Sequence, residues 1–332
     1  MKLSQRIANK AHRVLLFGPP KSGKTELAGK LSAKFNLLWF DLENGIDTLL
    51  KLPKEQQERI EVIAIPDTRS FPIAIETCLK VIKGGKGTIC EVHGKWNCMT
   101  CAKTPAETPA TAVCLSELPL DTIVVFDSLT QLTNSAISHI TKAQSDDYKL
   151  DFDDWGNLGK LMDIFLSHVQ QAGFHVVCIS HEMEAEMEDG KKKLVPTAGT
   201  RNFSRNAAKY FDEVVYCEVK NKRHVAGSST LYNGNILTGS RSGTSLESQS
   251  EASLIPIFTG TYSGIGLENV GGNSSGPSGS PGKISADAPL SNSLTNISNK
   301  NTPAHAAVTS LEDRLAKLRS DRAEKEKKSK QS

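Results

Sequence analysis

A short turn rich in glycine, proline and lysine, placed between an apolar run and a helical pattern, most constrains what this chain can fold into. It reads Gly18, Pro19, Pro20, Lys21, Ser22, Gly23, Lys24 and Thr25, and Glu26 follows it. This is the pattern G-x-x-x-x-G-K-[ST], in the strand-then-helix context that a phosphate loop requires. Glycines let backbone N–H groups curl around phosphates, and the positive end of a helix dipole adds to the attraction. We therefore predict that residues 18–26 bind ATP, with Lys24 on its β- and γ-phosphates and Thr25 on Mg²⁺.

Six apolar runs indicate the architecture around this loop. They cover residues 13–17, 37–43, 60–65, 122–128, 174–180 and 212–219. Such runs are typical of strands buried on both faces of a parallel sheet. Helical patterns separate them, and the clearest places apolar residues at helical spacing between Leu158 and Val169. The alternation predicts an α/β fold with a mainly parallel sheet flanked by helices.

Polar residues at the ends of three of these runs are candidates for catalysis. Asp127 is near the end of the fourth run, where a carboxylate can hold Mg²⁺ through water. Asp41 and Glu43 end the second run and, two residues apart, point to the same side. We take Glu43 as the general base that activates water. His181 follows the fifth run and is placed to hydrogen-bond the γ-phosphate; a plain polar residue at a strand end is the alternative reading.

These features occur in a fixed order: the phosphate loop, an acidic residue after the second strand, an apolar strand ending in "FDS", and a polar residue ending the next strand. The set resembles the RecA-like P-loop NTPase core. Over residues 10–245, the "GPPKSGKT" loop and the segment "PTAGTRNFSRNAAKYFDEVVY" look most like the phage-encoded Sak-type ATPases of single-strand annealing and recombination.

The resemblance implies ATP hydrolysis coupled to binding of single-stranded DNA, in homo-oligomers that hold the nucleotide between subunits. The stretch "TGSRSGTSLE" resembles one that supplies cations to a neighbour's phosphate, although the family's lysine is missing here. Arg241 is therefore a candidate arginine finger, because the transferred γ-phosphoryl group develops charge that an arginine stabilises. An ordinary hairpin arginine is the alternative.

Basic residues gather in the loop or hairpin predicted at residues 182–210. They are Lys191, Lys192, Lys193, Arg201, Arg205 and Lys209, with the aromatic Phe203 among them. Cations neutralise backbone phosphates and an aromatic ring stacks on a base, as a single-strand groove needs. In the family this side faces DNA, so we predict DNA contacts there. A mobile charged hairpin is the other reading.

Metal-ligand residue types cluster in an insertion at residues 84–118. Cys90, His93, Cys98 and Cys101 have the spacing C-x2-H-x4-C-x2-C, which suits tetrahedral zinc with sulfur and nitrogen ligands. Cys114 is an alternative to His93 as the fourth ligand. We predict a structural zinc knuckle, because four protein ligands leave no open position for catalysis.

The composition changes after about residue 245, where the predicted ATPase core of residues 1–245 ends. Residues 246–308 are rich in Gly, Ser, Pro and Asn and cannot bury enough apolar surface to offset the entropy of ordering, so we predict a disordered linker. Residues 309–332 predict a charged C-terminal helix. It is either a solvated helix or a docking element for a partner such as a single-strand binding or replication protein.

Charge and hydropathy limit the class of protein. The formal net charge of +3 does not indicate a general nucleic-acid binder, so any basic surface is local. The sequence shows no secretory signal and no apolar run of bilayer length. We expect a cytoplasmic protein, in the host cytoplasm if phage-encoded, without a membrane partner and with reduced or metal-bound cysteines.

Two functions from different classes remain open. The first is a Mg²⁺-dependent ATPase of phage-type DNA recombination. The second is a nucleotide-gated adaptor in replication or packaging, with little affinity for DNA. The number of subunits, the choice between annealing and strand exchange, and the preference for ATP over other triphosphates stay open.

Overall fold

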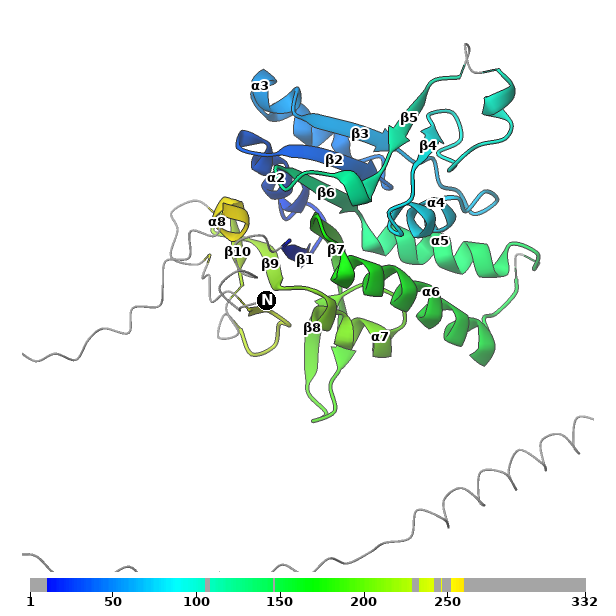
Figure 1. Cartoon of the computed structure of the whole chain (residues 1–332). Coiled ribbons are helices and arrows are strands. Elements are labelled where there is room, and N and C mark those ends of the chain that lie inside the picture. Colours follow the sequence, from blue (N-terminus) through cyan, green and yellow to red (C-terminus); the bar gives the residue numbers. More distant parts are fainter. Residues whose placement is uncertain are drawn as a thin grey trace, which may run out of the picture. The chain divides into compact units, whose positions relative to one another are not determined.

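The computed structural model describes residues 11–259, apart from gaps at 105–107, 146, 229–232, 242–245 and 247–251. Its centre is one large sheet, drawn in Figure 1. The parallel strands of this sheet are β1 (Arg13–Gly18), β2 (Asn36–Asp41), β3 (Ile60–Ala64), β6 (Thr122–Asp127), β7 (His175–Glu186) and β9 (Glu213–Lys220). Antiparallel strands complete it: β8 (Lys192–Pro196), β10 (Arg223–Gly227) and β11 (Gly239–Ser240). The predicted mainly parallel α/β sheet is confirmed.

The strand order decides which chain segments meet at the carboxyl edge of the parallel strands. The order is β10-β9-β1-β7-β6-β2-β3, with β8 paired to β7 and β11 paired to β9. Gly18 on β1 is in register with His181 on β7, and Asp41 on β2 with Asp127 on β6. Since the strands are parallel, these four residues lie at the same carboxyl edge.

The core has two halves, because side chains alternate along every central strand. On β1, Leu15 and Phe17 pack into one half and Val14 and Leu16 into the other. The first half is covered by α4 (Ala74–Val81), α5 (Leu129–Thr141) and α6 (Phe152–Gln171). The second half is covered by α2 (Lys24–Gly29), the 3₁₀ turns Lys30–Ala33 and Ile46–Lys51, and α8 (Ile255–Thr259). The short helices α3 (Lys54–Gln57) and α7 (Arg201–Asn206) complete the fold.

The two longest helices begin where their sequences predict. Ser128 caps α5 by accepting a hydrogen bond from the backbone N–H of Gln131. Asp151 and Asp154 form a reciprocal capping box at the start of α6. Leu158, Phe165 and other apolar residues of α6 are fully buried, so the helical stripe seen in the sequence is its core face.

Two hairpins extend from this core. The first is a separate two-stranded sheet of β4 (Gly87–Cys90) and β5 (Ala110–Val113), which stands above α4 and α5 in Figure 1. The second is formed by β8 and the end of β7, and it protrudes at the bottom of that view. They occupy the inserted segment at 84–118 and the first half of the segment at 182–210.

The predicted end of the core at residue 245 is wrong, because a short apolar segment beyond it is part of the fold. Leu246, Leu254, Ile257 and Phe258 are buried in the second half of the core, and residues 255–259 form α8. Their burial removes apolar surface from water, which a linker cannot do. The folded part thus reaches Thr259. The rest of the predicted linker, from residue 260, and the predicted helix at 309–332 lie outside the described residues. No helix in the described part is long and apolar enough to span a membrane.

Candidate functional site

The phosphate loop depends on two glycines that no other residue could replace without strain. Gly18 has φ +150°, and a Cβ there would meet the carbonyl oxygen of Cys217 on β9 at 2.0 Å. Gly23 has φ +88°, and its Cβ would meet the ring of His224 on β10 at 2.8 Å. Both dihedrals lie in the region that favours glycine. The loop therefore packs tightly against β9 and β10.

Lys24 is buried inside this loop. Its Nζ donates hydrogen bonds to the carbonyl oxygens of Gly18 and Pro19, at 3.0 and 2.8 Å. Burial lowers the pKa of Lys24, while the nearby carboxylates of Asp127 and Glu43 oppose that shift. The ammonium group thus lies inside the loop, and its contact with the phosphates stays a prediction.

Thr25 and Asp127 meet although they are far apart in the sequence. Thr25 Oγ1 donates to Asp127 Oδ2 at 3.1 Å. Burial raises the pKa of Asp127 to about 7, and the neighbouring carboxylates Glu43 and Asp41 add to the rise. Asp127 is buried and has other carboxylates beside it, so a bound cation would stabilise its ionised form. The donor set is of the hard oxygen type that Mg²⁺ prefers, so these residues fit the predicted ion.

Glu43 is held in place by two polar side chains. Ser128 Oγ donates a hydrogen bond to Glu43 Oε1, and His181 Nε2 lies 3.5 Å from Glu43 Oε2. Burial alone would raise the pKa of Glu43, but the bonds from His181 and Ser128 outweigh it and the net shift is downward. Glu43 is therefore ionised and can accept a proton. The structure brings Lys24, Asp127, Glu43 and His181 together, as the sequence predicts.

These residues surround one cavity of about 440 Å³ at the carboxyl edge of the sheet. Residues 20–26 form one side, and Glu43, Asp127, Ser128 and His181 form the other. A second cavity of about 340 Å³ shares Ser22, Gly23, Glu26 and His224 with the first. It continues between α2 and β10, where Leu27 and Val225 provide apolar lining. The two cavities together have room for a triphosphate tail and a base.

Sequence reasoning missed two members of this site. Ser128 was part of a strand-end motif, and only the pairing of β2 with β6 shows that its hydroxyl reaches Glu43. His224 had no signal in the sequence. Its Nδ1 donates to the carbonyl oxygen of Ser22 at 3.0 Å, which fixes the loop against β10.

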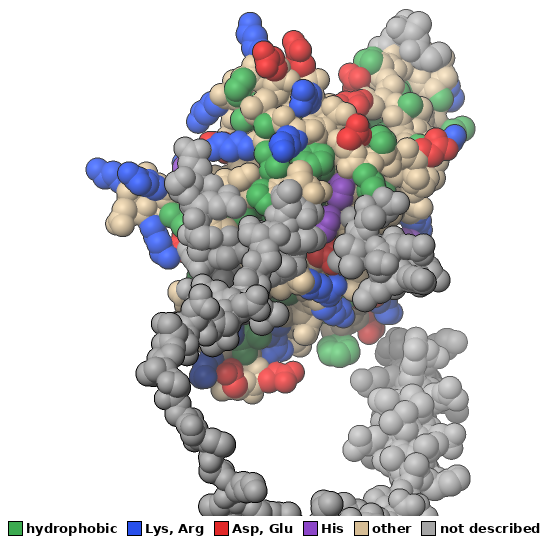
Figure 2. Space-filling view, turned by 60° about the vertical axis from the view of Figure 1, so that its left-hand side comes forward, with side chains coloured by type: hydrophobic (Ala, Val, Ile, Leu, Met, Phe, Trp, Pro, Cys, Tyr) green, Lys and Arg blue, Asp and Glu red, His purple; other side chains and the backbone are tan. Residues whose placement is uncertain are grey.

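The basic residues predicted to bind DNA lie on the β7–β8 hairpin and on the segment that follows it. Lys191 pairs with Asp189 at 3.5 Å, and Lys192 pairs with Glu184 at 2.8 Å. Lys193 lies on β8 and Arg201 begins α7. On the face drawn in Figure 2, lysine and arginine side chains are spread from top to bottom and have acidic side chains among them. The two ion pairs show that the hairpin itself carries both positive and negative side chains.

The remaining predicted contacts are engaged within the fold. Phe203 stacks on Tyr210 with the ring centroids 6.0 Å apart, and Lys209 lies over the same ring at 4.7 Å. Arg205 bonds to the carbonyl oxygen of Glu186 and to the side chain of Asn202. Their contact with DNA stays a prediction.

Arg241 lies away from the phosphate loop, at the opposite edge of the sheet. It forms an ion pair with Asp212 at 3.5 Å and donates to the carbonyl oxygen of Lys209 at 2.9 Å. Its backbone N–H bonds to the carbonyl of Asp212, directly before β9. Within one chain Arg241 does not reach the cavity at residues 20–26. A role in trans stays a prediction.

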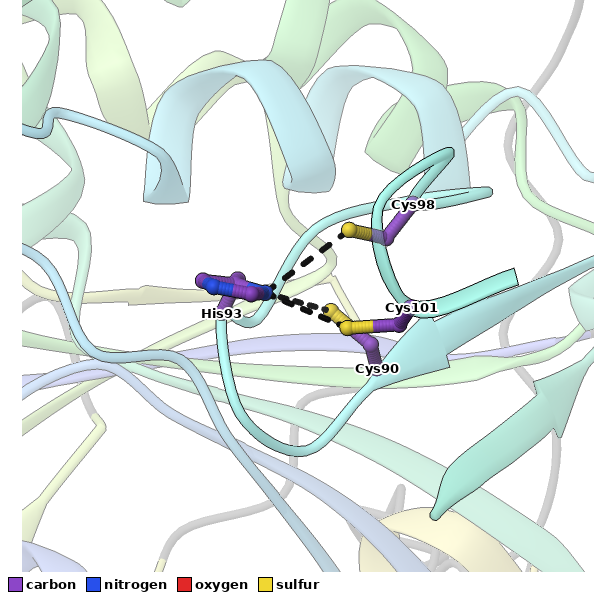
Figure 3. A group of neighbouring side chains, drawn as sticks. All are labelled: Cys90, His93, Cys98 and Cys101. Atoms are coloured by element: carbon purple, nitrogen blue, oxygen red, sulfur yellow. Dashed lines mark hydrogen bonds between the residues drawn. The ribbon is translucent and has the colours of Figure 1, made fainter. Parts of the chain in front are cut away.

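The four predicted zinc ligands come together, as Figure 3 shows. The ligand atoms of Cys90, His93, Cys98 and Cys101 all lie within 4.8 Å of one another, and the three thiols are buried. Backbone N–H groups of Cys101 and Thr100 stabilise the thiolate of Cys98 and lower its pKa. The arrangement is compatible with zinc.

Comparison with known proteins agrees with this geometry. No curated protein sequence matches the chain. The family described as "AAA domain" matches residues 10–244, which include the phosphate loop, Glu43, Asp127 and His181. Membership supports binding and hydrolysis of a nucleoside triphosphate with Mg²⁺. With most of its length matched and its loop, acidic partners and parallel sheet in place, the chain belongs to the AAA-domain family of P-loop ATPases.

Proposed function

We propose that this protein hydrolyses ATP and couples hydrolysis to work on single-stranded DNA, in recombination of the phage type. The observation that carries the hydrolytic part is the position of Glu43. Its carboxylate is held by Ser128 and His181 and shares one cavity with Lys24 and Asp127. A base, a cation and a metal-binding carboxylate around one cavity are what transfer of a γ-phosphoryl group to water requires.

Each residue of the site has a separate role in the proposed hydrolysis. Backbone N–H groups of the loop and the ammonium of Lys24 bind and orient the β- and γ-phosphates. Thr25 and Asp127 hold Mg²⁺, which neutralises charge on the phosphates when bound. Glu43 takes a proton from the attacking water, and Ser128 and His181 keep its carboxylate pointed at that water.

The cavity between α2 and β10 supports a site for the base. It adjoins the phosphate loop at Ser22 and Gly23, and Leu27 and Val225 supply the apolar contact that a purine face needs. Glu26 and Lys30 on the same wall pair at 3.0 Å and present both a hydrogen-bond acceptor and donors. We assign the nucleobase to this cavity and the triphosphate to the larger one.

Single-turnover hydrolysis with Lys24→Ala and Glu43→Gln tests the assignment. Lys24→Ala removes the ammonium that binds phosphate, so ATP affinity and hydrolysis should both be lost. Glu43→Gln keeps the size and a hydrogen-bond acceptor for Ser128, so ATP should still bind while hydrolysis falls by about 100-fold or more. Lys34→Ala, at an exposed lysine outside both cavities, is the matched control for charge removal. Normal turnover in either Lys24→Ala or Glu43→Gln contradicts the mechanism.

Action on single-stranded DNA rests on the resemblance and on the exposed cations of the β7–β8 hairpin. The test is a titration with single-stranded DNA at fixed salt, with and without ATP, together with the ATPase rate. Fixed salt matters because affinity driven by phosphate contacts falls steeply as salt rises. A rate stimulated by DNA, and weaker binding in Lys193→Ala and Arg201→Ala, support the proposal.

A nucleotide-gated adaptor remains the second candidate, and one observation favours it. Lys191 and Lys192 already pair with acidic residues of their own hairpin, which reduces the positive potential available to DNA. An ATPase indifferent to single-stranded DNA over the same titration would select the adaptor. The trans role of Arg241 is tested separately. The ATPase rate per chain is measured at rising protein concentration until the wild type reaches its plateau, where the oligomer is complete. At that concentration Arg241→Ala should have a lower rate than the wild type.

A further inference from the structure

The segment that carries Cys90, His93, Cys98 and Cys101 (the Cys/His cluster) packs against the core. Cys90 ends β4, and Cys101 begins a 3₁₀ turn. The intervening chain is pinned on both sides: Thr77 Oγ1 on α4 donates to the carbonyl oxygen of Gly94 at 2.8 Å, and this bond is buried. Trp96 packs against the core and against Gly87, where a Cβ would meet its ring at 2.2 Å. The cluster is therefore held at a fixed place on α4 and β4.

The distances in the cluster fit a tetrahedral ion. His93 Nδ1 lies 3.2, 3.8 and 3.7 Å from the sulfurs of Cys101, Cys90 and Cys98. Zinc bonds of about 2.3 Å to sulfur and about 2.1 Å to nitrogen require nitrogen-to-sulfur separations of about 3.6 Å at the tetrahedral angle. In Figure 3 the imidazole nitrogen and the sulfurs point toward a common centre. Three sulfurs and one nitrogen are the donors of a Cys₃His site.

The geometry also decides between the two candidates for the fourth ligand. Cys114 is not part of the group that shares a centre. Its Sγ lies 3.4 Å from Ser116 Oγ and 3.9 Å from the carbonyl oxygen of Gly84, at the base of the insertion. His93 occupies the position that Cys114 would have to reach.

The turn between Cys90 and His93 lines a cleft that also contains the carboxylate of Glu43. Gly94 packs so closely on the end of β3 that a Cβ would meet Pro66 and Ile65 at 2.8 and 2.9 Å. The preceding residues Glu91 and Val92 line a cleft of about 800 Å³ that also contains Glu43 and His181. The cleft thus has the turn between Cys90 and His93 as one wall and the catalytic edge of the sheet as another.

We propose that Cys90, His93, Cys98 and Cys101 bind one structural Zn²⁺, and that this ion fixes the Glu91–Val92 wall of the cleft beside Glu43. This inference does not rest on the proposed function. On binding, each thiol gives its proton to solvent and the imidazole binds through Nδ1. Four protein ligands leave no open position, so the ion orders the chain and takes no part in hydrolysis. Without the ion, the turn keeps the bond from Thr77 to Gly94 but loses the link between Cys90, His93 and the segment of Cys98 and Cys101.

The first test is metal content in the full chain. Protein purified without chelator should contain about one zinc per chain by elemental analysis. Cys101→Ser should lose nearly all of it, whereas the matched variant Cys114→Ser should keep it. Cobalt added to the metal-free chain should give the intense visible absorption of a tetrahedral cobalt–thiolate site in the wild type. A zinc-free wild type, or zinc lost from Cys114→Ser and kept in His93→Ala, overturns the ligand assignment.

The second test concerns the wall and needs no substitution, so it does not depend on whether Cys101→Ser folds. Zinc is removed from the wild type with a chelator, and hydrogen exchange is followed by peptide mass spectrometry. Exchange should rise at least tenfold over residues 88–97 and stay the same in the β1 strand. Unchanged exchange over residues 88–97 would show that the ion does not fix the wall. ATP affinity, measured alongside, separates this result from a failure of the nucleotide site.

Discussion

The buried carboxylate of Asp127 makes a quantitative prediction about stability. Its pKa rises from 3.8 to about 7, first because it is buried and then because Glu43 and Asp41 lie close by. A rise of this size corresponds to on the order of 4 kcal/mol of free energy of unfolding. The sign follows from linkage: the folded state binds the proton more tightly, so the penalty is absent below about pH 4, grows with pH and is complete above about pH 7.

Asp127→Asn removes the charge and keeps an oxygen that can accept the hydrogen bond from Thr25. Without Mg²⁺ or nucleotide, it should therefore be more stable than the wild type by several kcal/mol at pH 8 and by under about 2 kcal/mol at pH 5. Urea denaturation at both pH values measures this difference. Asp121→Asn, at the other end of the same strand and exposed, is the control and should stay within about 0.5 kcal/mol.

Mg²⁺ and a non-hydrolysable triphosphate should narrow this difference. At 100 times the Kd, ligand stabilises the wild type by about 2.7 kcal/mol, which offsets most of the penalty, and Asp127→Asn should gain much less because it lacks the carboxylate that holds the ion. Equal stability of the two proteins at pH 8 without ligand, or a less stable Asp127→Asn, would refute the electrostatic reasoning.

Further predictions concern the rest of the nucleotide site and the end of the fold. His224→Ala removes the bond to the carbonyl oxygen of Ser22 and should raise the Kd for ATP several-fold in a fluorescent-nucleotide titration, with hydrolysis of bound ATP unchanged. Ser128→Ala should raise the pKa of Glu43, which appears as a shift to higher pH of the acidic limb of the rate profile; an unshifted limb would exclude the contact. Phe258→Ala should cost roughly 3–4 kcal/mol in urea denaturation, whereas a substitution in a true linker would cost nothing measurable.

The sheet and the phosphate loop could be predicted because their signals are local. Strands buried on both faces appear as continuous apolar runs, and the loop has a fixed pattern between a strand and a helix. The prediction that Asp127, Glu43 and His181 share a site needed only the rule that parallel strands end at one edge. The bond from Ser128 to Glu43 needed the pairing of β2 with β6, which no single run of residues reveals.

Two other features could not be predicted for physical reasons. The apolar residues around Ile257 form a helix too short to have a periodic signal, and their burial depends on a core surface made by distant strands. The pairing of Lys191 and Lys192 with Asp189 and Glu184 depends on the register of the hairpin, so a count of cations overstated the free positive charge.

Strand β7 connects the central sheet to the exposed hairpin. It runs from His175 to Glu186 without a break, and His181 lies in its middle. Its first half is locked between β1 and β6, while its second half forms one arm of the exposed hairpin. The arm of the hairpin and the residue that contacts Glu43 therefore belong to one continuous strand. We expect a ligand that displaces this arm to shift His181 and, with it, the carboxylate of Glu43.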